Sequence, residues 1–340
     1  MSTFDPLLPT AAPEPRLEQA LADMRAGKFV VLVGAAERRG EGTLTIAAEH
    51  CGADAVAYMA RHGRGIVSLC LTEERCDELG LSPMTRTNTS TYHAAFTVSI
   101  EAREGISTGI SAADRARTIA VAVNPSSTAA DLVSPGHIFP LRARRGGVLA
   151  RVAHTEGAVD LASLAGLQPA GVICGILTAD GDMAGPVEIE SVAADLGLAV
   201  LPVDDLVAHR RRTERWIVPA GERALRTATG DFRAHAFEEQ HTGLTHIALV
   251  KGNAQADGPV FVHDECPSGD VFGAVDCGCG GGLMRSLEEL ERAGAGVLVY
   301  VAGRTDERRL RDVVEPTCTP GVISLKAEDV ARQVLAELGR

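Results

Sequence analysis

Three cysteines in the second half of the chain have the spacing of a metal site. Cys266, Cys277 and Cys279 follow the pattern C-x10-C-x-C in the stretch CPSGDVFGAVDCGCGGG. Three thiolates leave one position on zinc open, which is typical of a catalytic site, whereas structural sites usually have four protein ligands. The residues alone also allow three buried thiols without a metal. We expect bound zinc, and the spacing leaves its role open.

The composition indicates a two-domain protein of the α/β class. The 340 residues are enough for two hydrophobic cores, and 45% of them are hydrophobic. A net charge of −12 disfavours nucleic acid as a partner. Because the chain has neither an apolar run of 18 residues nor a basic leader, we expect no membrane association and a cytoplasmic location. The five other cysteines are expected to be reduced and buried.

The elements that must position these groups follow from the hydrophobic pattern. Helices are predicted where SAADRARTIAVAV opens on a serine with an acid three residues later, and where PVEIESVAADLG begins with proline and ends on glycine. A polar stretch broken by proline and glycine, 207–227, is expected to join two domains. Runs rich in β-branched residues predict buried strands at 29–34, 65–71, 96–102, 171–177 and 198–203.

Six motifs before that junction resemble the 3,4-dihydroxy-2-butanone 4-phosphate synthases of riboflavin biosynthesis. The resemblance extends over about residues 16–212. The motifs are ERRGEGTLTIAAE (37–49), RHGRGIVSLCLT (61–72), NTSTYHAAFTVSIEA (88–102), STGISAADR (107–115), SPGHIFPLRARRGGVLARVAHTE (134–156) and LAGLQPAGVICGIL (163–177). Later, FRAHAF, HIALVKG, HDECPSGDVFGAVDCGCG and GVLVY resemble GTP cyclohydrolase II. Together they resemble the bifunctional riboflavin-biosynthesis family.

The resemblance implies a fold and a domain plan. We expect a flexible tail over 1–15, a mixed-sheet α/β synthase-like domain over 16–212, a linker over 213–226, and a shortened α+β zinc domain over 227–340. Synthase-like domains usually pair, so a homodimer is expected. The second domain is expected to be short because DERRLRDVVEPTCTPGV leads almost directly into EDVARQVLAELGR, which resembles the closing helix of the cyclohydrolase family.

The positions that carry the family reaction are occupied by other residue types. The family loop D-D-E-D-R-E-N-E-G-D, which supplies a magnesium ligand, reads GAAERRGEGT here, with Arg39 at the ligand and Thr43 at the last acid. The catalytic glutamate of the family matches Gly175. His154 matches a second magnesium ligand, but one imidazole beside an arginine is a poor site for a cation that prefers carboxylates. The sequence therefore assigns no catalytic residue and predicts no functional magnesium.

The residues that match the family's substrate contacts are retained more fully than the catalytic positions. Arg38, Asp114, Arg151 and Thr155 stand at positions that bind phosphate or sugar or face the site, which implies a small phosphorylated metabolite as the ligand. A second interpretation stays open. In it Arg38 and Arg151 pair with Glu37, Glu41 or Glu156 in a structural network.

In the second domain the zinc ligands match but their surroundings do not. The family arginine before the second cysteine is Asp276, the glutamine before Leu283 is Gly282, and a phosphate-handling motif is replaced by VAGRTDERRL (301–310). Without these guanidinium groups, binding of a triphosphate loses its basis. We therefore expect no GTP cyclohydrolase activity and a zinc that holds the domain together.

Taken together, the residues favour a diverged paralogue of the bifunctional enzyme. The first hypothesis is an enzyme, of the lyase type if active, repurposed to a related phosphosugar or heterocycle. The second is a non-catalytic regulatory or scaffolding partner of the riboflavin enzymes. The third is residual conversion of ribulose 5-phosphate to 3,4-dihydroxy-2-butanone 4-phosphate and formate.

Overall fold

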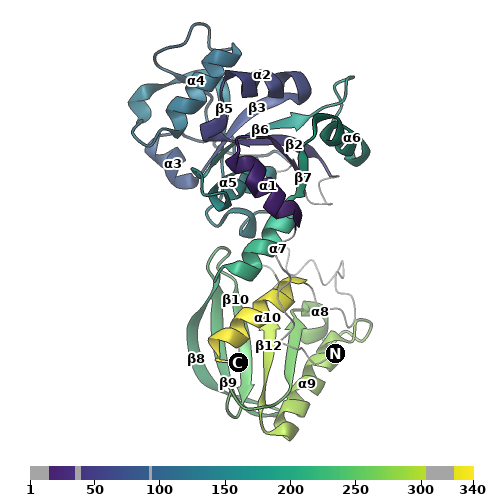
Figure 1. Cartoon of the computed structure of the whole chain (residues 1–340). Coiled ribbons are helices and arrows are strands. Elements are labelled where there is room, and N and C mark those ends of the chain that lie inside the picture. Colours follow the sequence, from purple (N-terminus) through teal and green to yellow (C-terminus); the bar gives the residue numbers. More distant parts are fainter. Residues whose placement is uncertain (1–14, 35–39, 92–93, 304–324) are drawn as a thin grey trace. The chain divides into compact units, whose positions relative to one another are not determined.

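The chain folds into two compact units. The computed structural model describes residues 15–34, 40–91, 94–303 and 325–340. The chain divides between Arg210 and Arg211, and we call the parts before and after this point the first and the second unit. Each unit is built around its own β-sheet (Figure 1). In the described part of the chain, no helix is long and apolar enough to span a bilayer.

The first unit contains a mixed sheet, as expected. The strand order is β4-β5-β3-β6-β2-β1-β7. Strand β7 pairs with β1 and strand β5 with β3 in parallel, and the other neighbours are antiparallel. The strands are β1 (Val30–Val33), β2 (Gly42–Ala47), β3 (Arg64–Leu71), β4 (Ile100–Ala102), β5 (Leu132–Arg142), β6 (Ala170–Ile176) and β7 (Ala199–Pro202).

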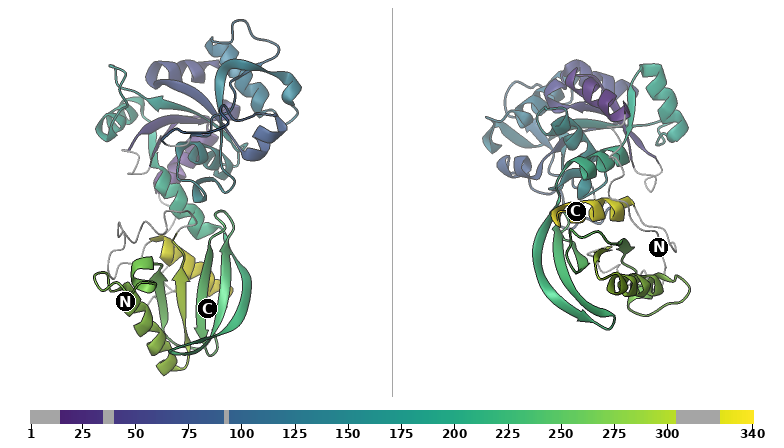
Figure 2. Two further views of the ribbon diagram at one scale, coloured as in Figure 1. Left: turned by 180° about the vertical axis from the view of Figure 1, so that it is seen from behind. Right: turned by 60° about the horizontal axis from the view of Figure 1, so that its bottom comes forward.

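Helices cover both faces of this sheet (Figures 1 and 2). Side chains of a strand alternate between faces. On β6 the Cys174 thiol contacts the carbonyl of Met59 in α2, whereas Gly171 lies against Ala158 of α5. The α-helices are α1 (Pro15–Arg25), α2 (Ala53–His62), α3 (Glu73–Glu78), α4 (Ala112–Val123), α5 (His154–Leu164), α6 (Pro186–Leu196) and α7 (Val203–Thr213), with 3₁₀ turns η2 (Ala48–His50), η3 (Ala129–Asp131) and η4 (Gly147–Leu149).

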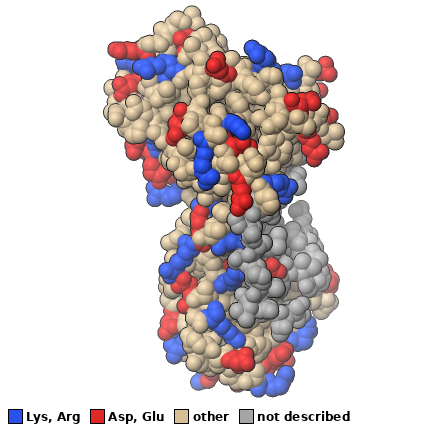
Figure 3. Space-filling view, viewed as in Figure 1, with Lys and Arg blue, Asp and Glu red and all other residues tan. Residues whose placement is uncertain are grey.

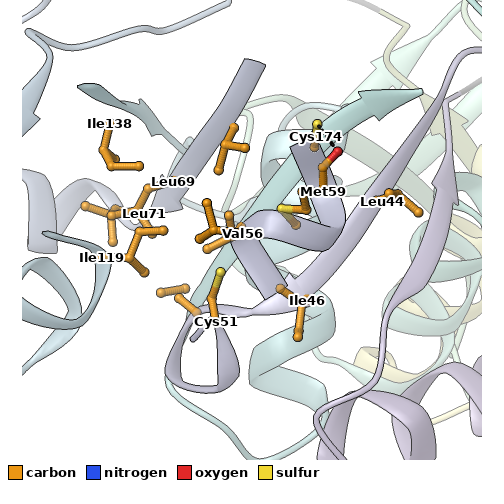
Figure 4. Packing of buried hydrophobic residues seen from close by; sticks show 14 of the residues in the cluster. Leu44, Ile46, Cys51, Val56, Met59, Leu69, Leu71, Ile119, Ile138 and Cys174 are labelled. Atoms are coloured by element: carbon orange, nitrogen blue, oxygen red, sulfur yellow. Dashed lines mark hydrogen bonds between the residues drawn. The ribbon is translucent and has the colours of Figure 1, made fainter. Parts of the chain in front are cut away.

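A single apolar layer lies between the sheet and the α2 and α4 helices. Leu69 and Leu71 of β3, Val56 and Met59 of α2 and Ile119 of α4 are fully buried in it (Figure 4). Burying one such side chain stabilises the fold by about 1.5–3 kcal/mol, so this layer fixes the sheet as a rigid base.

Local signals in the sequence explain several of these elements. Ser111 caps α4 by accepting a hydrogen bond from the amide of Asp114 at 3.0 Å, and α6 starts at Pro186 and ends at the left-handed Gly197. The five predicted strands are present, although the one expected over 96–102 is regular only in β4. Strands β2 and β5 were not predicted, because charged motifs and two prolines obscured their periodicity.

The second unit contains a five-stranded sheet in the order β11-β12-β10-β9-β8. Only β11 and β12 are parallel. Leu287 and Leu290 of α9 pack with Phe232, Phe261 and Leu298 in the core. The elements are β8 (Ile217–Thr227), β9 (Gly230–Glu239), β10 (Thr245–Lys251), β11 (Val260–Asp264), β12 (Gly296–Val301), α8 (Pro267–Asp270), α9 (Cys279–Ala293) and α10 (Leu325–Glu337).

The structure differs from the expected linker over 213–226. Most of that segment lies in β8, which pairs with β9 from Ile217 to Thr227 around an irregularity between Pro219 and Gly221. Most side chains of β8 are exposed. Polar residues, proline and a bulge are typical of an edge strand, so the pattern that suggested a linker belongs to the edge of the second sheet.

A buried carboxylate connects the second sheet to α10. Glu239 at the end of β9 is 4% exposed, and its Oε2 lies 3.2 Å from Nζ of Lys326 and 3.5 Å from Nε2 of His246. Burial raises the pKa of Glu239, but the neighbouring imidazole of His246 and the charge of Lys326 outweigh it and lower the pKa to about 2. The ionised carboxylate thus stabilises the folded second unit.

We expect Glu239→Gln to destabilise the second unit by about 3 kcal/mol at pH 7. A depressed pKa gives stability that is present above the ordinary glutamate value and lost as pH falls toward about 2. The difference from wild type should therefore shrink between pH 5 and pH 2. Urea unfolding followed by Trp216, the only tryptophan, measures this unit. Glu222→Gln, an exposed ion-pair control, should change stability little, and an equal loss in both variants would contradict the assignment.

Candidate functional site

In the first unit, the pairing of β2 with β6 brings two of the predicted positions together. Thr43 lies directly opposite Gly175, and Thr45 opposite Ile173. Opposite residues of an antiparallel pair share a face, and the hydroxyls of Thr43 and Thr45 lie 3.2 Å apart. A Cβ at Gly175 would meet nothing closer than Met183 Cε at 4.0 Å. Two substituted family positions therefore adjoin, with open space beside the glycine.

The N-terminal end of α5 lies beside the start of β2. His154 is buried, and its Nε2 lies 3.0 Å from the carbonyl oxygen of Glu41, two residues before Thr43. A carbonyl only accepts hydrogen bonds, so Nε2 carries the proton in this contact. Thr155 follows in the first turn of α5 and is also buried. The structure therefore places the start of α5, with His154 and Thr155, beside the first residues of β2, whose Thr43 pairs with Gly175 of β6.

Arg151 lies next to a buried acid. Its guanidinium is 3.6 Å from Oε1 of Glu156, which also accepts a hydrogen bond from the amide of Arg144 at 3.0 Å. Glu156 is 0% exposed, and burial raises its pKa although the charge of Arg151 opposes the shift. This contact is the one expected if Arg151 pairs with a glutamate in a structural network. It also holds the guanidinium at the end of the loop before α5.

Asp114 organises a loop. Its carboxylate accepts hydrogen bonds from the amide and hydroxyl of Ser107 at 3.1 and 2.8 Å and from the amide of Gly109 at 3.0 Å. These bonds, above all the one from the Ser107 hydroxyl, lower the pKa of Asp114. The side chain of Asp114, which was itself expected to face the site, thus shapes the 107–109 turn.

Two further pairs of interacting side chains in this unit were not predicted from the sequence. His137 is hydrogen-bonded to Glu101, and both lie against Gly109. Asp160 of α5 accepts from the amide of Val148 at 2.8 Å and from Arg210 at 2.6 Å. Asp160 lies one helical turn after Glu156, a spacing that places both acids on the face toward the 144–151 loop. This four-residue spacing was the sequence signal from which Asp160 could have been found.

Of the positions matched to a magnesium ligand or to the catalytic glutamate of the family, the structure describes His154 and Gly175. Among the residues that the structure describes, the one group of three or more potential metal ligands is the cysteine trio. The Nε2 of His154 is already hydrogen-bonded to a carbonyl, and Gly175 offers no ligand. The predicted positions Arg38 and Arg39 lie outside the described residues.

The three predicted zinc ligands do converge. The sulfurs of Cys266, Cys277 and Cys279 lie within 4.8 Å of one another, and those of Cys266 and Cys277 are 3.9 Å apart. A tetrahedral zinc with Zn–S bonds of about 2.3 Å holds its sulfurs about 3.8 Å apart. The trio therefore fits zinc, which would neutralise part of the thiolate charge and join the α8 turn to α9.

Backbone geometry supports this cluster from two sides. Cys266 caps α8, and its sulfur accepts a hydrogen bond from the amide of Gly269 at 3.4 Å. Cys279 opens the 15-residue helix α9, where the positive end of the helix dipole favours a thiolate. A Cβ at Gly269 would lie 2.8 Å from the amide nitrogen of Gly280, so only glycine lets the two helices meet.

The fold and the site define a two-domain protein that joins a mixed-sheet synthase unit to a thiolate-bearing cyclohydrolase-type unit. The family model of 3,4-dihydroxy-2-butanone 4-phosphate synthase matches residues 18–209, and that of GTP cyclohydrolase II matches residues 219–316. The chain belongs to the bifunctional riboflavin-biosynthesis family that combines these two domains.

Curated relatives and a solved structure agree with this membership. The chain is 46% identical over 290 residues to riboflavin biosynthesis protein RibBA of Salinispora arenicola, covering 84% of this chain and 69% of the relative. It is 44% identical to a 3,4-dihydroxy-2-butanone 4-phosphate synthase of Pseudomonas syringae, covering 90% and 84%. The crystal structure of RibBX of A. baumannii, a two-domain synthase, matches with a TM-score of 0.79, 35% identity and coverage of 95% and 91%.

We expect the purified chain to bind one zinc per molecule through the cysteine trio. Removing zinc with a chelator, or replacing Cys277 by serine, should lower the melting temperature of the second unit by at least about 5 °C, since a ligand that binds only the folded state stabilises it. Metal analysis and Trp216 fluorescence measure both effects. Cys51→Ala, which alters a buried thiol in the first unit, should keep its zinc. Zinc retained in Cys277→Ser would contradict the site.

Proposed function

We propose that the first unit binds a phosphorylated ketopentose of the ribulose 5-phosphate class and serves riboflavin biosynthesis. The observation that carries this proposal is the contact of His154 with Glu41, which places the start of α5 beside the first residues of β2, where Thr43 pairs with Gly175. Arg151 is held three residues before α5. A guanidinium fork fits a phosphate, and the N-terminal end of a helix favours an anion.

The first candidate reaction is that of the family, conversion of ribulose 5-phosphate to 3,4-dihydroxy-2-butanone 4-phosphate and formate. It is supported by the relatives, among them a synthase of Pseudomonas syringae and the two-domain RibBX, which extend over both units of this chain. In such a reaction Arg151 and Thr155 would hold the phosphorylated end of the sugar, and the site edge at Thr43 and Gly175 would face the carbons that react.

A second candidate is binding without the family turnover, for another substrate or for regulation of the riboflavin enzymes. Two residues favour it. Arg39 and Gly175 stand where the synthase family carries carboxylates. Neither a glycine nor a guanidinium can replace an acid that binds magnesium or moves a proton. The positive charge of Arg39 and the missing side chain of Gly175 both act against proton abstraction.

For the second unit we propose a structural zinc and no GTP hydrolysis. The acid Asp276, whose carboxylate accepts a hydrogen bond from the amide of Cys277 at 3.1 Å, adds negative charge beside three thiolates. Such a site attracts a cation and repels a triphosphate. Two relatives that extend over both domains are named as synthases alone, which agrees with this proposal.

We expect ribulose 5-phosphate to bind to the purified protein, and Arg151→Ala to weaken binding at least about tenfold, since charged hydrogen bonds contribute about 1.5–3 kcal/mol. Isothermal titration measures this. The control Arg226→Ala removes an exposed arginine of the second unit and should leave binding unchanged. Unchanged affinity in Arg151→Ala would refute the phosphate site.

The double variant Arg39→Glu with Gly175→Glu distinguishes the family reaction from binding without the family turnover. If wild type binds the sugar without turning it over, the double variant should release formate at least about 100-fold faster than wild type with ribulose 5-phosphate and Mg²⁺, since a positioned acid or base contributes about 10²–10⁴-fold. The open space at Gly175 accepts the new side chain. The control Gly52→Glu adds an acid at another open position. If wild type releases formate and the double variant is no faster, wild type carries out the family reaction with groups other than acids at positions 39 and 175.

A further inference from the structure

A buried carboxylate stands behind the first zinc ligand. Asp270, the last residue of α8, accepts three hydrogen bonds: from the amide of Cys266 at 2.8 Å, from Nε2 of His263 at 2.9 Å and from the hydroxyl of Tyr300 at 2.9 Å. The Asp270 side chain is 5% exposed, as is that of His263. A carboxylate taken out of water is tolerated only where its oxygens are hydrogen-bonded, and this one is.

The donors come from three separate parts of the second unit. His263 lies on β11, Cys266 lies between β11 and α8, and Tyr300 lies on β12. His263 and Tyr300 are direct partners in the parallel pair of β11 and β12, and their rings stack with centroids 5.4 Å apart. Asp270 therefore ties the turn that carries Cys266 to the two strands beneath it.

The hydrogen bond to the amide of Cys266 fixes the direction of its side chain. The same residue is held from the other side, because its sulfur accepts from the amide of Gly269. With the backbone of Cys266 held by Asp270 and its sulfur held by Gly269, the thiol stays 3.9 Å from the sulfur of Cys277. A metal that binds here meets sulfurs already spaced for it.

We propose that Asp270 is a positioning residue for the zinc site, which acts through Cys266 with His263 and Tyr300 as its supports. Groups behind a ligand commonly fix its orientation, and their loss costs about 10–100-fold in metal affinity. The proposal concerns the second unit alone and does not depend on the ribulose 5-phosphate function of the first.

Glu239 provides a matched comparison within the same unit. It too is a buried carboxylate with a histidine neighbour, but its partners are His246 and Lys326 and not a residue of the cysteine trio. Glu239→Gln should therefore lower stability while leaving the metal site unchanged. Asp270→Asn should alter the metal site itself.

The test uses full-length Asp270→Asn, Tyr300→Phe and Glu239→Gln loaded with Co²⁺ or Zn²⁺. We expect Asp270→Asn to weaken Zn²⁺ binding about 10–100-fold in competition with a chromophoric chelator. We also expect it to change the cobalt d–d bands, which report the geometry around the metal. Tyr300→Phe, which removes one hydroxyl, should weaken Zn²⁺ binding in the same direction by less than tenfold. Glu239→Gln should match wild type in affinity and spectrum.

Wild-type Zn²⁺ affinity and cobalt spectrum in both Asp270→Asn and Tyr300→Phe would overturn the proposal. If Asp270→Asn does not fold, Tyr300→Phe decides, because it keeps the ring that stacks on His263. An equal loss of affinity in Glu239→Gln would also overturn it, since the effect would then follow general stability.

Discussion

The antiparallel pairing of β2 with β6 is the constraint on which the first unit depends. Both strands are central in the seven-stranded sheet, and their register sets Thr43 opposite Gly175. A shift by one residue would turn every side chain of β2 to the other face. The same pairing places the carbonyl of Glu41 next to His154, so that the start of α5 lies beside the first residues of β2. The loop that ends in Arg151 is then fixed by two acids of α5, Glu156 and Asp160.

Buried carboxylates have a comparable part in the second unit. Glu239 joins β9 to α10, and Asp270 joins β11, β12 and the turn before α8. Burial raises the pKa of Asp270, but the hydrogen bonds from His263, Cys266 and Tyr300 outweigh it and lower the pKa. Such groups specify one arrangement of their neighbours, because any other leaves a charge unpaired in a dry interior. This specificity matters most where three sulfurs must meet.

Individual charged groups, and not the charge of the surface as a whole, distinguish the two units. On the face shown in Figure 3, acidic and basic side chains of the described residues are interspersed over the surface. In our proposal, attraction for an anion comes from individual groups such as Arg151 and the start of α5. Around the cysteines the neighbouring acids favour a cation. The chain thus carries a site that we propose for a phosphorylated sugar and a cysteine trio whose geometry fits a metal ion.

The sequence by itself determined the family, the two domains, the zinc trio and most strands, because motif order and the spacing of Cys266, Cys277 and Cys279 are local properties of the chain. It could not identify β2 and β5, whose patterns are irregular, and it assigned the edge strand β8 to a linker. Only the tertiary structure decided that Arg151 lies beside Glu156 and that Asp270 supports Cys266. Those contacts join residues through backbone amides and buried side chains, and a carboxylate has no sequence signature that tells which amide it will meet in the folded chain.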